Sequence, residues 1–130
     1  MSSPDASKQT IMVVDDSDDV RELMALQLRI SGYDVVEARN GLESVELARR
    51  SRPALILMDI NMPVLDGVEA TRAIRGIEEV CRVVIVAFSA LASGDGRRAL
   101  EAGCNGYVNK NEGINDVPGV VRRYLPAAFC

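Results

Sequence analysis

Short apolar runs alternate with amphipathic segments along most of the chain. Runs rich in branched aliphatic residues predict five strands, at residues 10–14, 33–38, 54–58, 82–88 and 106–109. Apolar residues at helical spacing predict five helices, at residues 18–31, 41–52, 66–75, 92–102 and 115–125. In the first helix, the buried face is expected to carry Val20, Leu23, Met24 and Leu28, widened by Leu26 and Ile30.

This alternation indicates the fold class. Five strand-helix units in succession predict an α/β protein, built as a doubly wound parallel sheet with helices on both faces. The run "ALILM" has no polar alternation, which is typical of a central strand covered on both sides. No linker divides the chain, so we expect a disordered leader at 1–8, one domain at 9–126 and a short tail at 127–130.

Composition narrows the possible functions without naming one. With 130 residues, 48% hydrophobic and 26% charged, the chain is an ordinary globular domain. A net charge of −4 without a basic stripe argues against direct nucleic-acid binding. No apolar run approaches the roughly 18 residues of a membrane span, and the leader does not resemble a secretory signal, so we expect a cytoplasmic protein that binds no membrane. Cys81, Cys104 and Cys130 have no metal-ligand spacing and are expected to be reduced thiols.

The first apolar run ends in an acidic cluster, "IMVVDDSDD", whose like charges repel one another. With Ser17 as an N-cap, Asp18 and Asp19 fall in the first turn of a helix, where negative charge is favoured. Asp15 and Asp16 precede that cap and follow a buried strand. They are either part of a solvated turn or ligands of a hard cation.

Polar side chains also follow three of the other predicted strands: Asp59, Ser89 and Lys110. Ligands of doubly wound sheets gather outside the carboxyl ends of the strands. Each of these residues alone is typical of a turn, a cap or a solvated surface. Together with Asp15 and Asp16, they predict one site with three carboxylates, a hydroxyl and an ammonium group.

Such a site has the groups that phosphoryl transfer needs. The three carboxylates of Asp15, Asp16 and Asp59 would hold Mg²⁺. Asp59 is the predicted nucleophile, because a metal ion and an ammonium group stabilise the oxygens of a phosphoryl group in transfer. Lys110 would place its positive charge against the transferred phosphoryl group, and Ser89 would donate a hydrogen bond to one of its oxygens.

Four separated motifs, "VVDDS", "LILMDINMPVLDG", "VAFSA" and "GYVNK", resemble those of the receiver domains of two-component response regulators. The resemblance covers roughly residues 9 to 125. It implies a flavodoxin-like sheet in the order 2-1-3-4-5 flanked by five helices. It also implies that Asp59 accepts a phosphoryl group from a histidine kinase or a histidine phosphotransfer protein, and that phosphorylation changes the face that meets a downstream protein target.

The resemblance also assigns roles to single residues. Asp16 is a direct Mg²⁺ ligand, Asp15 a ligand largely through water, and Asn61 a ligand through its backbone carbonyl. Ser89 and Tyr107 are the switch residues. An alternative for Tyr107 is an ordinary half-buried strand aromatic. "NMPVLDG" is open to a similar alternative, a tight turn that has its proline and glycine for backbone reasons.

One position departs from the family pattern: its usual Lys-Pro is Lys110-Asn111 here. A bond to proline prefers trans by only about 0.5–1 kcal/mol, whereas a cis bond to Asn costs roughly 3–4 kcal/mol. We therefore expect a trans bond. Gly113, which is able to take a positive φ, is expected to give the following loop a different path.

The sequence thus predicts a phosphorylation-controlled signalling switch that catalyses only its own phosphorylation and slow dephosphorylation. One alternative is a pseudo-receiver, a binding scaffold that is never phosphorylated. Another is a receiver excised from a hybrid kinase. A phosphatase with an aspartyl intermediate is disfavoured, because "MDINM" offers no second acid beside the nucleophile.

Overall fold

The computed structural model describes residues 9–90 and 95–125. The expected leader and tail, and the start of the helix expected from residue 92, lie outside the described residues. Five parallel strands form one sheet in the order β2-β1-β3-β4-β5. They are β1 (Thr10–Val14), β2 (Asp34–Ala38), β3 (Leu55–Asp59), β4 (Val84–Ser89) and β5 (Gly106–Asn109). The predicted doubly wound sheet and its implied strand order are confirmed.

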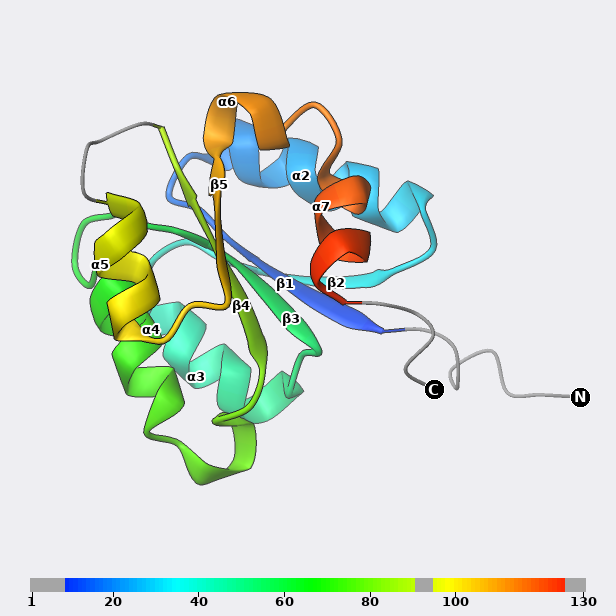
Figure 1. Cartoon of the computed structure of the whole chain (residues 1–130). Coiled ribbons are helices and arrows are strands. Elements are labelled where there is room, and N and C mark those ends of the chain that lie inside the picture. The colour runs from blue at the N-terminus through cyan, green and yellow to red at the C-terminus, as the bar shows by residue number, and fades with distance from the viewer. Residues whose placement is uncertain (1–8, 91–94, 126–130) are drawn as a thin grey trace, which may run out of the picture.

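Helices cover both faces of this sheet (Figure 1). One face carries α2 (Asp18–Ile30) and α7 (Val117–Tyr124). The other face carries α3 (Gly41–Ser51), α4 (Gly67–Arg75) and α5 (Asp95–Ala102). A 3₁₀ turn (Glu78–Val80) and the short helix α6 (Lys110–Gly113) complete the elements. Within the part of the chain that the structure describes, no helix has the length and apolarity that crossing a membrane requires.

Successive residues of a strand enter opposite layers of the core. Ile11 and Val13 pack under α2 and α7, whereas Met12 and Val14 pack under α3 and α4. All four are at most 2% exposed. Since both faces of β1 are buried from Ile11 to Val14, these four residues are all apolar, and the same reason explains the run "LILM" in β3.

Cap residues place the helix starts close to where the sequence predicts them. Ser17, Asn40 and Asp66 are extended N-cap residues whose side chains accept a backbone N–H of the first turn. Gly32 follows α2 with a φ of +98°, as expected for a residue that ends a helix.

The buried face of α2 differs from the prediction. Leu23, Leu26 and Ile30 are 46%, 54% and 77% exposed, so their assignment to the core was wrong. Arg21 and Ala25 are buried in their place. Part of the apolar stripe of α2 therefore faces solvent.

The segment after β5 also differs from the prediction. Residues 110–113 form a sixth helix, α6, whereas the sequence predicted a loop and the resemblance implied five helices. Asn109 caps α6 by accepting the Asn111 N–H at 2.9 Å. Gly113 is helical and does not take a positive φ, so that expectation was wrong. No cis peptide bond occurs among the described residues, so the Lys110-Asn111 bond is trans, as predicted.

Candidate functional site

The parallel sheet brings the predicted site residues to one edge. Asp15 and Asp16 follow β1, and β3 and β4 end at Asp59 and Ser89. Lys110 follows β5 as the first residue of α6, the short helix at the top of Figure 1. Because all strands run in the same direction, these residues share the carboxyl edge.

Three carboxylates meet at this edge. Asp15, Asp16 and Asp59 each offer an oxygen, and these oxygens lie within 4.8 Å of one another. Asp15 and Asp59 are 1% and 5% exposed, whereas Asp16 is exposed. Two oxygens on opposite sides of one Mg²⁺ ion lie about 4 Å apart, twice the usual ligand distance of roughly 2.0–2.1 Å. The three carboxylates are the donor type that a hard divalent cation prefers, and their oxygens lie close to this spacing.

Lys110 already offsets part of the charge of this cluster. Its Nζ lies 2.8 Å from Asp15 Oδ2 and 3.5 Å from Asp59 Oδ2. Burial alone would lower the pKa of Lys110, but the hydrogen bond to Asp15 and the charge of Asp59 outweigh it and raise the pKa above its usual value. The ammonium group therefore stays charged.

The pKa of Asp59 is raised to about 7. Burial is the largest cause, followed by the charge of Asp15. Lys110 and the backbone N–H of Asn61, which donates a hydrogen bond to Asp59, act in the opposite direction but do not outweigh these effects. Without a further positive charge, Asp59 is therefore only partly ionised at neutral pH.

Three residues form polar contacts with Asp15: Lys110, Ser17 and Arg21. Besides its ion pair with Lys110, its Oδ1 accepts the Ser17 N–H at 2.9 Å. Arg21 donates to the backbone carbonyl of Asp15 at 3.0 Å and also pairs with Asp18 and Glu37. Arg21 was not predicted from the sequence, although its position one turn before Met24 on the apolar face of α2 is a signal.

The loop after Asp59 packs tightly against β3. A Cβ atom at Gly67 would lie 2.3 Å from the Asp59 backbone oxygen, so this position requires glycine. The Gly67 N–H donates to the Ile60 carbonyl at 2.9 Å. Val64 takes a φ of 73°, which is rare for a β-branched residue. The backbone reason predicted for the glycine of "NMPVLDG" is confirmed.

Ser89 and Asn61 share a partner that sequence analysis missed. Ser89 is fully buried, and its Oγ donates to Asp95 Oδ2 at 2.8 Å. Asn61 Nδ2 donates to the same oxygen at 3.3 Å. Asp95 is the first described residue of α5 and is 4% exposed. An acidic residue in a first helical turn is ordinary, so the sequence carries no signal that this one is buried.

Tyr107 lies on β5 beside α5. Its ring is half-buried and packs against the apolar cluster on the α3, α4 and α5 face. A Cβ atom at Gly96 would lie 3.2 Å from Tyr107 Cδ2, so the ring passes close to the first turn of α5. This position suits the implied switch role and the alternative of a plain strand aromatic equally well.

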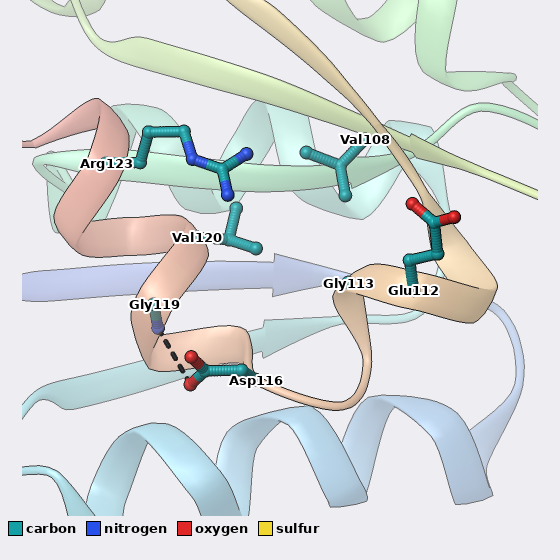
Figure 2. A pocket seen from close by; sticks show the side chains of 7 residues that line it. All are labelled: Val108, Glu112, Gly113, Asp116, Gly119, Val120 and Arg123. Carbon is teal, nitrogen blue, oxygen red and sulfur yellow. Dashed lines mark hydrogen bonds between the residues drawn. The ribbon is translucent and has the colours of Figure 1, made fainter.

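A separate hollow of about 250 Å³ lies between β5, α6 and α7 (Figure 2). Val108 and Val120 lie at its centre, with Glu112 and Arg123 at opposite ends. Asp116, on its rim, caps α7 by accepting the Gly119 N–H at 3.1 Å. None of the predicted site residues lines this hollow, so the carboxyl edge of the sheet is the candidate site.

Comparison with known proteins indicates the class of protein. A sequence model of the response regulator receiver domain matches residues 11–122. The polar-differentiation response regulator DivK of Brucella anthropi is 34% identical over 118 residues, which cover 90% of this chain and 96% of DivK. The chain belongs to the response regulator receiver domain family. It is therefore a signalling protein of the two-component class and not a conventional enzyme.

Solved receiver structures have the same fold. Chemotaxis protein CheY4 of Vibrio cholerae aligns with a TM-score of 0.85 at 26% identity, over 91% of this chain and 99% of CheY4. The receiver domain of a sensor histidine kinase from Pseudomonas aeruginosa PAO1 aligns with a TM-score of 0.82 at 37% identity, over 90% and 97% of the two chains. That receiver has a magnesium ion coordinated in its active-site cleft.

Proposed function

We propose that this protein is a phosphorylation-controlled switch that accepts a phosphoryl group on Asp59. The observation that carries the proposal is the contact of Lys110 with Asp15 and Asp59 inside a cluster of three carboxylates. A buried nucleophilic carboxylate, a charged ammonium group and a cation-binding set of oxygens at one strand edge are the parts that phosphoryl transfer requires. The phosphoryl donor in this proposal is a phosphohistidine on a histidine kinase or a histidine phosphotransfer protein.

The chain's own groups supply most of the chemistry. An Asp59 oxygen attacks phosphorus, the N–P bond of the phosphohistidine breaks, and the imidazole leaves with the bonding electrons and takes up a proton. Lys110 stabilises the charge on the phosphoryl oxygens, and Ser89 donates a hydrogen bond to one of them. The product is an aspartyl phosphate, which water hydrolyses slowly to restore Asp59.

The proposed cofactor is Mg²⁺. Its ligands would be Asp15, Asp16 and Asp59 with the backbone carbonyl of Asn61, and Asp15 would act largely through water. When bound, the ion neutralises carboxylate charge and stabilises the phosphoryl oxygens. The magnesium ion in the 37% identical receiver from Pseudomonas aeruginosa supports this assignment.

Two surfaces suit the proposed partners. The exposed apolar residues Leu23, Leu26 and Ile30 lie in the middle and C-terminal part of α2, whose first turn adjoins Asp16, and offer a contact surface for the phosphodonor. The face of α5, β5 and α7, with Tyr107 half-buried in it, would change for a downstream protein target. Phosphohistidine donors draw on ATP, so the proposal places the protein in the cytoplasm.

The alternatives make different predictions. A pseudo-receiver needs neither a cation site nor a lysine beside the acidic residue, so the complete set of Asp15, Asp16, Asp59 and Lys110 argues against it. A receiver excised from a hybrid kinase would keep the same chemistry with a different output.

Intact-mass measurement after incubation with Mg²⁺ and acetyl phosphate tests the proposal. The protein should gain the mass of one phosphoryl group, and Asp59→Asn should gain none. Asp116→Asn is a matched control, because Asn also caps helices and this residue lies away from the cluster. A wild-type protein that is never phosphorylated would support the pseudo-receiver instead.

A further inference from the structure

Asp95 holds two side chains of the candidate site at one carboxylate oxygen. Its Oδ2 accepts hydrogen bonds from Ser89 Oγ at 2.8 Å and from Asn61 Nδ2 at 3.3 Å. Its Oδ1 lies 3.5 Å from an Arg98 nitrogen. Asp95 is 4% exposed, so these groups replace the water that would otherwise surround its charge.

The contact with Ser89 competes with the proposed chemistry. A serine hydroxyl has one hydrogen to donate, and in this structure Asp95 accepts it. A phosphoryl group on Asp59 would need the same hydrogen. Ser89 therefore cannot serve Asp95 and the phosphoryl group at once.

We propose that Asp95 is a positioning residue that holds Ser89 in its resting arrangement, so that phosphorylation must break the hydrogen bond between Ser89 and Asp95. This inference rests on the proposed function of Asp59. The bond stabilises the unphosphorylated protein and lowers its affinity for a phosphoryl group. Asp95 thus sets the balance between the two states of the switch.

Once Ser89 has turned to the phosphoryl group, the Asp95 carboxylate would connect the site to the face of α5, β5 and α7. Without Ser89, Asp95 keeps Asn61 and the half-exposed Arg98, which also lies 3.9 Å from Asp66. The next residue, Gly96, lies against the ring of Tyr107. A shift of the first turn of α5 would therefore change the packing of the Tyr107 ring directly.

Beryllofluoride, an analogue of the phosphoryl group, tests the inference by titration in saturating Mg²⁺ with ¹⁹F NMR. Asp95→Asn should bind it roughly tenfold more tightly than wild type, equivalent to about 1.4 kcal/mol. The same variant should unfold at a lower temperature without the analogue, because it loses charge-assisted hydrogen bonds. A merely structural role would weaken both properties. Unchanged or weaker analogue binding would overturn the inference.

A double-mutant cycle separates the hydrogen bond from simple charge removal. In a Ser89→Ala background Asp95 has no serine to hold, so adding Asp95→Asn should give no further gain in affinity. An equal gain in both backgrounds would show that the carboxylate acts only by repelling the anion, and would overturn the inference. Asp66→Asn is the matched control. It removes the same charge beside Arg98 without touching Ser89 and should leave affinity unchanged.

The unmutated protein provides a test that does not depend on whether variants fold. In a crystal structure of its beryllofluoride complex, Ser89 Oγ should contact the analogue and no longer Asp95. A complex that retains the Ser89 bond to Asp95 would overturn the inference but leave the proposed function intact. A wild-type protein that binds no beryllofluoride would overturn both.

Discussion

At the scale of single residues, the site is a balance of charges. Two buried carboxylates, Asp15 and Asp59, share the ammonium group of Lys110, and the exposed Asp16 adds a third negative charge. The single ammonium group does not neutralise the cluster, and the pKa of Asp59 is still raised to about 7. This remaining negative charge is what suits the site to the proposed cation.

Replacing Asp16 with Asn should have opposite effects with and without metal. The change removes a carboxylate from the proposed set of metal ligands, so Mg²⁺ affinity should fall by at least about tenfold. Mutating residues that only hydrogen-bond to a metal ligand already causes a loss of this size. In chelator the same change relieves repulsion, since the charge of Asp16 raises the pKa of Asp59. The variant should then melt slightly above wild type in chelator, and a lower melting temperature there would refute the electrostatic account.

In the metal-free protein, the contribution of Asp59 to stability should fall as pH rises from about 4 to about 7. Burial and the charge of Asp15 raise the pKa of Asp59 to about 7 in the folded protein, while in the unfolded chain it is near 3.9. Between these values the folded state holds a proton that the unfolded state has lost. The free energy of unfolding therefore falls with increasing pH, by about 1.36 kcal/mol for each unit of pKa difference.

Urea unfolding in chelator at several pH values measures this slope. Asp59→Asn cannot titrate and should flatten it, whereas Asp116→Asn should leave it as in wild type. If the slope is the same in all three proteins, the raised pKa does not belong to Asp59.

At the scale of elements, α6 replaces the loop expected after β5. Gly113 of α6 packs closely against the sheet, because a Cβ atom there would lie 2.6 Å from Val108 Cγ1 and 2.9 Å from Phe88 Cε2. The same short helix begins at Lys110. Close packing of this turn therefore helps to fix the lysine that contacts Asp15 and Asp59.

Gly113→Ala should lower the free energy of unfolding by about 1–3 kcal/mol, as overpacked core positions do. Chemical denaturation measures the change. Gly76→Ala is the matched control, because a Cβ atom at Gly76 would meet its nearest neighbour at 3.4 Å, an ordinary contact. Equal effects of the two changes would show that the turn gives way easily, and that α6 does not hold Lys110 rigidly.

At the scale of the whole molecule, the two edges of the sheet have different tasks. The carboxyl edge carries the charged site. At the amino edge, Arg75 of α4 donates to the backbone carbonyls of Cys81, Val83 and Gly103 and to the Asn105 side chain. It thereby ties α4 to the segments that lead into β4 and β5.

Arg75→Lys should destabilise the protein without changing its chemistry. Lysine lacks the planar fork that reaches all four acceptors, and each buried carbonyl left without a donor costs about 1–3 kcal/mol. Thermal melting should show a clear loss of stability, while beryllofluoride affinity at a temperature where the variant is folded should match wild type. Arg72→Lys, an exposed position on the same helix, should change neither. A loss of affinity in Arg75→Lys would mean that the two edges are coupled.

The sequence by itself determined the features that depend on near neighbours in the chain. Side-chain periodicity indicated the five strands, and cap residues such as Ser17 and Asn40 marked helix starts. The carboxyl-edge residues were predictable because parallel strands bring the residues after them to one edge. That rule predicted from the sequence alone that Asp59 and Lys110 lie close together.

Tertiary structure decided what depends on contacts between distant segments. The burial of Arg21, the exposure of Ile30 and the helical turn of α6 follow from how much sheet surface each helix covers and how closely it approaches. The raised pKa of Asp59 needs the depth of the site as well as its charges. The contact of Ser89 with Asp95 had no signal in the sequence, because a hydrogen bond across folded segments depends on atomic positions that local periodicity does not specify.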